Sequence, residues 1–159
     1  MGQMNLFELS YKYVMDASVF LSQKDGQPYD RKTYRTLWSN IERLIKANVI
    51  ITSSEIFDEL HDEEVVQWLN GVHCVIIAID DEIQENVIKI VTSNPKLVNI
   101  GQNKSSGDPF LIATAMKYDL TVITEEHKNS PKKIPQVCEN MGVDCINING
   151  LCLREDWKF

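Results

Sequence analysis

The sequence predicts a single-domain α/β protein, a three-layer α/β/α fold around a central, mostly parallel sheet. Its 159 residues are about the length of one domain. Short runs rich in Val and Ile alternate along the chain with longer segments whose apolar residues recur at helical spacing. Because the strand runs are continuously apolar, we expect helices to cover both faces of the sheet.

The elements follow one another in the order that a parallel sheet requires. Strands are predicted at residues 11–15, 48–51, 74–79, 121–124 and 144–148. Helices are predicted at residues 30–46, 54–69, 81–91 and 109–118, with loops at 93–107 and 128–135. In sheets of this kind ligands bind at the carboxyl ends of the strands, so we look for chemistry there.

The composition is that of an ordinary globular protein with an acidic balance. The chain is 43% hydrophobic and 25% charged, and 16 Lys and Arg against 23 Asp and Glu give a net charge of −7. This balance argues against holding nucleic acid through bulk positive charge. The charges are uneven, however, because residues 24–46 carry six Lys or Arg and three Asp or Glu.

The sequence favours the cytoplasm and offers no zinc pattern. It has no apolar run of the length that crosses a bilayer, and its start lacks the basic and apolar regions of a secretory signal. The four cysteines show no Cys-x-x-Cys spacing and the three histidines are scattered. We therefore expect no membrane association and reduced cysteine thiols.

Acids and hydroxyls follow two of the predicted strands directly. Asp16 ends the first strand, with Ser18 two positions later, and Thr124, Glu125 and Glu126 end the fourth. A carboxylate at such a place is costly unless it is solvated or bound to a cation. The simpler interpretation of Asp16 and Ser18 is that they cap the following turn, a role that both residue types perform well.

A further acid follows the second strand. Residues 52–55 (TSSE) have the Ser/Thr-x-x-Glu pattern of a capping box, and Glu55, Glu59 and Glu63 share a helix face at four-residue spacing. A solvated acidic face is the simpler interpretation. Glu59 is the exception that we select, because one turn into the helix it is expected to lean toward the sheet edge where Asp16 lies.

Asp108 completes a set of four acids. It precedes Pro109 at the start of the most apolar helix, and an Asp cap explains it fully without any catalysis. Together, Asp16, Glu59, Asp108 and Glu126 would repel one another at one sheet edge unless a divalent cation neutralised them, and oxygen ligands suit Mg²⁺ or Mn²⁺. Two such ions would activate a water and stabilise the leaving oxygen in phosphate chemistry.

These motifs resemble the PIN-domain family, and most closely the VapC-type toxin ribonucleases. The resemblance rests on YVMDAS at residues 13–18, on residues 54–60, on GDP at 107–109 with IATA at 112–115, and on VITEE at 122–126. The segment 133–147 resembles an uncharacterised bacterial subgroup of PIN proteins. The resemblance implies a PIN-like nuclease domain at residues 11–159, preceded by an N-terminal extension at residues 1–10.

The resemblance also implies an activity and the residues that carry it. The expected activity is a Mg²⁺- or Mn²⁺-dependent endoribonuclease that hydrolyses RNA phosphodiester bonds, as the toxin of a bacterial toxin–antitoxin pair. By motif, Asp16, Glu59 and Asp108 match the first three metal-binding acids. The fourth motif usually reads Thr, any residue, then Asp or Asn, so Glu126 is the expected match and Glu125 the alternative.

Supporting and RNA-binding residues are assigned on weaker grounds. Ser18 and Thr124 match positions where the family has small polar residues beside the metals, although turn capping explains them equally well. Candidate RNA contacts are the basic residues Arg31, Lys32, Arg35 and Lys128. Each basic segment is also explained as a solvated face.

Two other classes of protein fit the same residues. A binding module would hold one metal weakly or none, with the helices between residues 30 and 69 contacting an antitoxin or forming a homodimer. An acidic-pocket phosphoryl-transfer protein, such as a phospho-accepting receiver or a phosphatase, would use Asp16 as the covalent nucleophile. Such sites normally include a well-placed Lys, and none closely follows the fourth or fifth strand.

Overall fold

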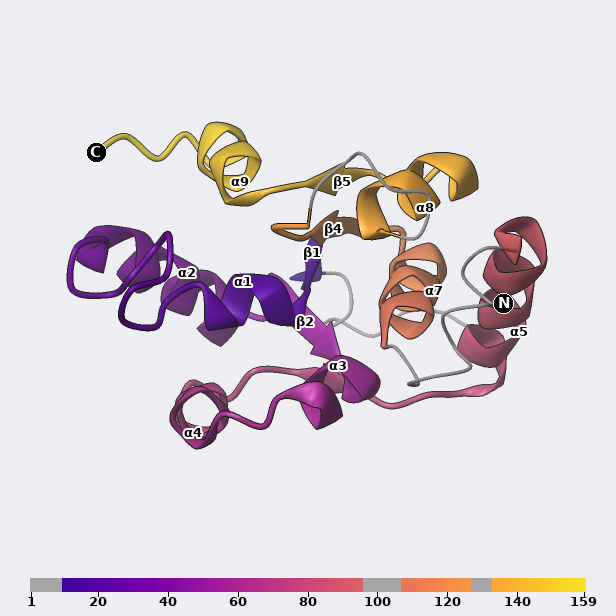
Figure 1. Ribbon diagram of the computed structural model, residues 1–159, viewed down its shortest axis with the longest axis horizontal. Helices are drawn as coiled ribbons and strands as arrows, with labels where there is room; N and C mark the ends of the chain where they lie inside the picture. The colour runs from indigo at the N-terminus through magenta and orange to yellow at the C-terminus, as the bar shows by residue number, and fades with distance from the viewer. Residues whose placement is uncertain (1–9, 96–106, 127–132) are drawn as a thin grey trace.

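A parallel sheet forms the centre of the molecule (Figure 1). The computed structural model describes residues 10–95, 107–126 and 133–159. In sheet order the strands are β3-β2-β1-β4-β5, and all four pairings are parallel. The strands are β1 (Tyr13–Met15), β2 (Ile50–Ser53), β3 (Ile76–Ile77), β4 (Thr121–Ile123) and β5 (Cys145–Ile146). The predicted fold class is confirmed, and the described sheet is entirely parallel.

Helices cover both faces of this sheet (Figure 1). One layer packs on the face that carries Tyr13 and Met15, and it contains α1 (Ala17–Leu21), α2 (Arg35–Lys46), α4 (Glu63–Gly71) and α9 (Ile148–Arg154). The opposite layer contains α3 (Ser54–Glu59), α5 (Asp81–Ser93), α7 (Asp108–Tyr118) and α8 (Ile134–Met141).

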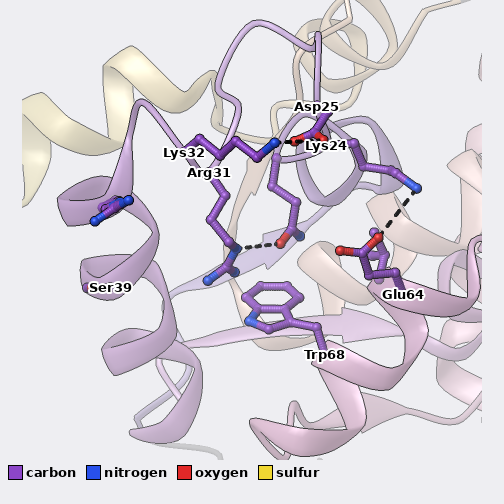
Figure 2. Close-up of a pocket in the computed structure, with 10 residues that line it drawn as sticks. Lys24, Asp25, Arg31, Lys32, Ser39, Glu64 and Trp68 are labelled. Atoms are coloured by element: carbon purple, nitrogen blue, oxygen red, sulfur yellow. Dashed lines mark hydrogen bonds and ion pairs between the residues drawn. The ribbon is translucent and has the colours of Figure 1, made fainter.

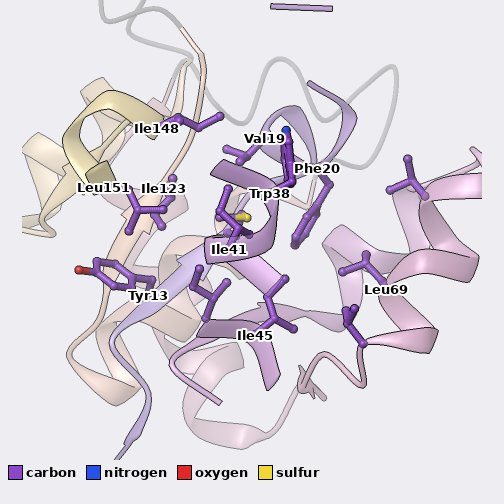
Figure 3. Close-up of a cluster of buried hydrophobic side chains, with 14 of the residues drawn as sticks. Tyr13, Val19, Phe20, Trp38, Ile41, Ile45, Leu69, Ile123, Ile148 and Leu151 are labelled. Carbon is purple, nitrogen blue, oxygen red and sulfur yellow. The ribbon is translucent and has the colours of Figure 1, made fainter. Parts of the chain in front are cut away.

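The central strand supplies both hydrophobic cores because its side chains alternate between the two faces. Tyr13 and Met15 join a cluster around Trp38, which is fully buried on α2 (Figure 3). Val14 points the other way and packs with Ile112 of α7. A strand that is buried on both faces has no polar positions, which explains its continuously apolar sequence.

Short polar side chains cap the N-termini of several helices. Ser53, Asp62, Asp80 and Asn147 each stand at an N-cap, and each accepts a hydrogen bond from the backbone N–H three residues later. The caps fix where the chain turns from each strand or loop into the next helix. Three of these helices, α3, α5 and α9, start at residues that follow a strand closely.

The predicted helix at 54–69 is wrong as a single element. The chain forms α3 and α4 with a break at Leu60, whose backbone is extended, and Asp62 caps the second helix. Glu59 and Glu63 therefore lie on different helices and do not share the predicted face. The capping-box prediction is also wrong, because the cap is Ser53 and its partner is the N–H of Ile56.

Other boundaries differ in smaller ways. The helix predicted from residue 30 begins at Arg35, and the most apolar helix is capped by Gly107, so that Asp108 is its first residue and not its cap. Helices α1, α8 and α9 were not predicted. Among the described helices, none has both the length and the apolar character needed to cross a membrane.

Candidate active site

The candidate site lies at the point where the strand order reverses. β1 pairs with β2 on one side and with β4 on the other, so the connections leave it in opposite directions. In open α/β sheets a crevice forms at the carboxyl ends of the strands at such a point, and ligands bind there. Asp16 follows β1 directly and Thr124 follows β4, which brings both residues to this crevice.

Asp16 is the most buried acid of the site, with 4% of its surface exposed. Its Oδ2 accepts hydrogen bonds from the Ser18 hydroxyl at 2.6 Å and the Thr124 hydroxyl at 2.9 Å. Burial raises the pKa of Asp16, and the two hydroxyl groups act in the opposite direction. The carboxylate thus joins the ends of β1 and β4.

The same two hydroxyls also organise the turn after β4. The Ser18 oxygen accepts the backbone N–H of Glu125 at 3.1 Å, and the Thr124 oxygen accepts that of Glu126 at 3.1 Å. Each hydroxyl donates to Asp16 and accepts from the turn. Ser18 and Thr124 therefore connect Asp16 to the backbone of Glu125 and Glu126.

Glu59 is the last residue of α3, and it is connected to the start of α7. Its Oε1 accepts the backbone N–H of Gly107, the cap of that helix. Partial burial raises the pKa of Glu59, the Gly107 N–H lowers it, and the charges of Asp16 and Glu126 raise it further. Glu59 is therefore within electrostatic reach of both other acids.

Glu125 and Glu126 point to different helices. The Glu126 carboxylate accepts the N–H of Ile134 at 3.0 Å, at the start of α8. Burial raises the pKa of Glu126, the Ile134 N–H opposes this, and the Asp16 charge adds to the rise. Glu125 instead accepts the N–H of Ile148 at 2.7 Å, at the start of α9.

Asp108 is half-buried and follows Gly107 at the start of α7. α7 leads into β4, so in this parallel arrangement its first turn lies at the carboxyl edge of the sheet. The Asp108 charge contributes to the raised pKa of Cys138 on α8, whose larger causes are a hydrogen bond with Cys145 and burial. The Asp16 charge thus acts on both Glu59 and Glu126, and Asp108 stands at the start of the neighbouring helix α7.

The acids approach one another without forming a closed metal cage. Among residues 10–95, 107–126 and 133–159, no three His, Cys, Asp or Glu side chains converge closely enough to hold an ion. Backbone N–H groups at Gly107 and Ile134 hold Glu59 and Glu126 instead. The donor set is nevertheless made of carboxylate oxygens, whose mutual repulsion a hard divalent cation would relieve. All four cysteines are free thiols.

The candidate RNA-binding residues Arg31, Lys32 and Arg35 follow α1 in the chain, and two of them form ion pairs. Arg31 is partly exposed and forms an ion pair with Glu42 of α2 at 2.9 Å. Lys32 forms an exposed ion pair with Asp25, and Arg35 is the first residue of α2. Lys128 lies outside the described residues.

Gly107 is a site residue that the sequence did not reveal. It is buried, and a Cβ at this position would lie 3.0 Å from the Glu59 Oε1 and 3.2 Å from the backbone carbonyl carbon of Glu55. The glycine is required by this close approach and not by an unusual backbone angle. The available signal was its place directly before Asp108, where a loop meets a helix.

Comparisons with known proteins agree with this fold. FitAcB from Neisseria gonorrhoeae is 15% identical, with a TM-score of 0.52 over 86% of this chain and 97% of its own. FitAB bound to an IR36 DNA fragment is 15% identical, with a TM-score of 0.54 over 86% and 94% of the two chains. PAE2754 from Pyrobaculum aerophilum is 11% identical, with a TM-score of 0.52 over 99% and 100%.

These identities are low, so the three structures establish a shared α/β fold. No curated protein matches the chain. A family model, however, matches residues 13–159, which is nearly the whole sequence and includes every described acid of the site. The chain has a PIN-like α/β fold. It belongs to the family described as a domain of unknown function (DUF4411).

Proposed function

We propose that this protein is a Mg²⁺- or Mn²⁺-dependent endoribonuclease that hydrolyses RNA phosphodiester bonds, and that it acts as the toxin of a toxin–antitoxin pair. The observation that carries the proposal is the buried Asp16 carboxylate at the topological switch point, bonded to Thr124 across β1 and β4. The Asp16 charge raises the pKa of both Glu59 and Glu126, and the Glu126 charge raises that of Glu59.

The donor set supports a divalent cation. Asp16, Glu59 and Glu126 would hold it, and Asp108 would join them from the start of α7. The Asp16 charge raises the pKa of Glu59 and of Glu126, so a hard cation bound by oxygen atoms would relieve the repulsion. When bound, the metal supplies a water of lowered pKa and stabilises the leaving oxygen.

The residues of the chain itself would position the reaction. Ser18 and Thr124 hold one oxygen of Asp16 and fix its orientation. The Gly107 N–H holds the Glu59 carboxylate from the start of α7. Such preorganisation places carboxylates before the substrate arrives, which lowers the cost of orienting them during the reaction. The similarity to FitAB, a protein solved on a DNA fragment, supports an association with nucleic acid.

A second candidate is a binding module of the same fold without turnover. It is favoured by one observation, that Glu59 and Glu126 are engaged by backbone N–H groups while no three acids of the described chain converge on one point. In this case the helices that pack on the Tyr13 and Met15 face of the sheet would bind an antitoxin or a second copy of the chain.

The deciding experiment compares the purified protein with its Asp16→Asn variant on structured and single-stranded RNAs. Each reaction is run with Mn²⁺, with Mg²⁺ and with chelator. We expect cleavage by the wild type that needs metal and disappears in the variant. Folded wild-type protein, shown free of any bound partner, that cleaves none of these RNAs would favour the binding module.

The toxin role is tested in cells. Expression of the wild type in a bacterial host should stop growth, and expression of Asp16→Asn to the same level should not. Co-purification of a small protein with the inactive variant from its native host would supply the antitoxin, and light scattering would show whether the chain dimerises. Equal growth with both proteins would contradict the toxin role without bearing on cleavage in vitro.

A further inference from the structure

A cavity of about 870 Å³ lies between the α1–α2 loop, α2 and α4 (Figure 2). Its volume is in the range of sites that bind small molecules. Four cationic side chains line it, Lys24, Arg31, Lys32 and Arg35, against the two carboxylates of Asp25 and Glu64. In a chain of net charge −7 this is a local reversal of sign.

Two of the four cations have internal partners. The Arg31 guanidinium donates to Gln23 at 3.0 Å and to Glu42 at 2.9 Å, and it lies over the Trp68 ring, 5.0 Å from its centroid (Figure 2). Lys24 pairs with Asp62, the cap of α4. Arg31 and Lys24 therefore build the walls of the cavity, and their charges are largely neutralised.

The other two cations are available. Arg35 and Ser39 lie one turn apart on the same face of α2, and both are exposed. Neither side chain has a hydrogen-bond or ion-pair partner within the described chain. Lys32 pairs only with Asp25, at 3.2 Å, and both side chains are about three-quarters exposed. An ion pair so exposed is weak and exchanges readily for another anion.

The start of α2 adds a third kind of donor. No side chain caps this helix of 12 residues, so the N–H groups of its first turn have no side-chain acceptor. The site supplies many hydrogen-bond donors, from a guanidinium, a hydroxyl and helix N–H groups. A carboxylate has only two oxygens to accept them. A phosphate, with its larger set of oxygen acceptors, matches them better.

We propose that Arg35, Ser39 and Lys32 form a phosphate-binding site for a nucleotide unit, distinct from the acid site. α1 lies between the two sites. It starts beside Asp16 and its five residues span about 7.5 Å, and the first residue that lines the cavity is Gln23. The phosphate belongs either to a free nucleotide or to an RNA strand. The second source rests on the proposed function, in which the site would hold RNA at a phosphate that is not cleaved.

Binding is measured in chelator, so that the acid site cannot contribute through a metal. Calorimetry with inorganic phosphate, with AMP and with a short single-stranded RNA tests the wild type, Arg35→Gln, Ser39→Ala and Lys32→Gln. Arg43→Gln is the matched control, because Arg43 is an exposed residue of the last turn of the same helix. Circular dichroism confirms that each variant is folded.

We expect Arg35→Gln to weaken binding at least tenfold, Ser39→Ala and Lys32→Gln severalfold, and Arg43→Gln less than twofold. Binding of AMP as tight as that of RNA identifies a free nucleotide as the source, and binding of RNA alone identifies a strand. Equal losses in Arg35→Gln and Arg43→Gln would overturn the site, because they indicate diffuse attraction. Absence of binding to all three probes would overturn it as well.

Cleavage assays separate this site from the proposed function. If both hold, Asp16→Asn binds RNA without cleaving it, and Arg35→Gln cleaves with a raised KM and an unchanged kcat. Arg35-dependent binding by a wild type that cleaves nothing would reject the nuclease and keep the site. Cleavage by a wild type whose Arg35→Gln variant binds and cleaves normally would reject the site and keep the nuclease.

Discussion

The backbone N–H of Gly107 donates a hydrogen bond to the Glu59 carboxylate, joining the start of α7 to the end of α3. The two residues are 48 positions apart in sequence. A larger residue would crowd this approach, because a Cβ at residue 107 would lie 3.0 Å from both the Glu59 Oε1 and the Ile56 Cδ1. The connection is therefore sensitive to the residue at position 107.

Replacing Gly107 with alanine should destabilise the protein by about 1 to 3 kcal/mol, because the added methyl group overpacks a well-filled contact. The free energy of unfolding, measured by urea denaturation, checks this. Gly71→Ala is the control, since a Cβ at this end of α4 meets nothing within 4 Å. It should be neutral or stabilise by up to about 1 kcal/mol. Equal effects of the two changes would contradict the close contact.

Without metal, the Asp16→Asn variant should become more stable than the wild type as the pH rises. Burial raises the pKa of Asp16 above its unfolded value, so the folded state retains the proton longer than the unfolded state. Stability is therefore lost between the unfolded pKa of about 4 and the raised folded pKa, and each unit between them costs about 1.4 kcal/mol. Asparagine does not ionise and escapes this loss.

Urea denaturation in chelator at pH values from 4 to 8 measures the difference between the two proteins. The advantage of Asp16→Asn should grow with pH and then level off. Asp58→Asn, at an exposed position of α3, is the control and should change stability by no more than about 0.5 kcal/mol. An advantage that is constant or shrinks with rising pH would show that Asp16 does not titrate as described.

Substitutions of the two acids after β4 should have different effects on stability and on cleavage. Glu125→Gln weakens the contact with Ile148 at the start of α9, so it should lower stability by about 1 kcal/mol and leave cleavage largely intact. Glu126→Gln should abolish metal-dependent cleavage and retain the fold. Thermal melting and an RNA cleavage assay on both variants provide the measurement. Loss of cleavage in Glu125→Gln alone would reverse the assignment.

Arg31→Gln should destabilise the fold more than it weakens RNA binding. The guanidinium bonds Glu42, which also accepts the Trp68 indole N–H at 2.6 Å, so the change leaves a half-buried carboxylate without its cation. A loss of about 1 to 3 kcal/mol is expected, because hydrogen bonds to charged groups are worth this much. Arg43→Gln should stay within about 0.5 kcal/mol in the same denaturation experiment.

Adding Mn²⁺ or Mg²⁺ should raise the melting temperature of the wild type. A ligand that binds only the folded state at a hundredfold excess over Kd stabilises it by about 2.7 kcal/mol. Asp16→Asn and Glu126→Gln should show a much smaller shift. Differential scanning fluorimetry with a metal titration measures the effect. An equal shift in wild type and Asp16→Asn would place the metal elsewhere.

The sequence was sufficient for the ends of β1 and β4 because buried strands have a distinct pattern, whereas the second strand was predicted to end at residue 51 and β2 ends at Ser53. The run Tyr13-Val14-Met15 is continuously apolar and ends abruptly at Asp16, and the same holds for the strand before Thr124. Carboxyl ends of parallel strands meet at one edge, so these residues could be placed together without coordinates. Glu59 and Asp108 depended on the family motif, because a solvated face and a helix cap explained them equally well.

The helix break at Leu60 could not be read from apolar spacing. Leu60 continues the spacing of Ile56 and Phe57, and the interruption comes from Asp62, which caps α4. The Asp-Glu-Glu start was a signal for a new helix, since acids favour the first turn. Helix α8 was missed for a similar reason, because Pro135 suggested a loop although Pro also occurs in the first turn of helices.

Contacts between distant residues account for the rest. Arg31 belongs to a basic run, and nothing in that run indicates that its partners are Glu42 and Trp68, which lie 11 and 37 positions later. Gly107 likewise depends on where α3 ends. Local patterns describe which residues are buried or begin a helix, whereas these roles are set by tertiary packing.

The sheet ends on both sides in very short strands, and this limits how copies of the chain can associate. β3 and β5 have two residues each, so their outer edges present few backbone groups to another strand. Long open edges invite intermolecular strand pairing, and short ones discourage it. Self-association of the described part of the chain would therefore proceed through helix surfaces, and growth by continuous sheet extension, as in fibrils, is disfavoured by the fold itself.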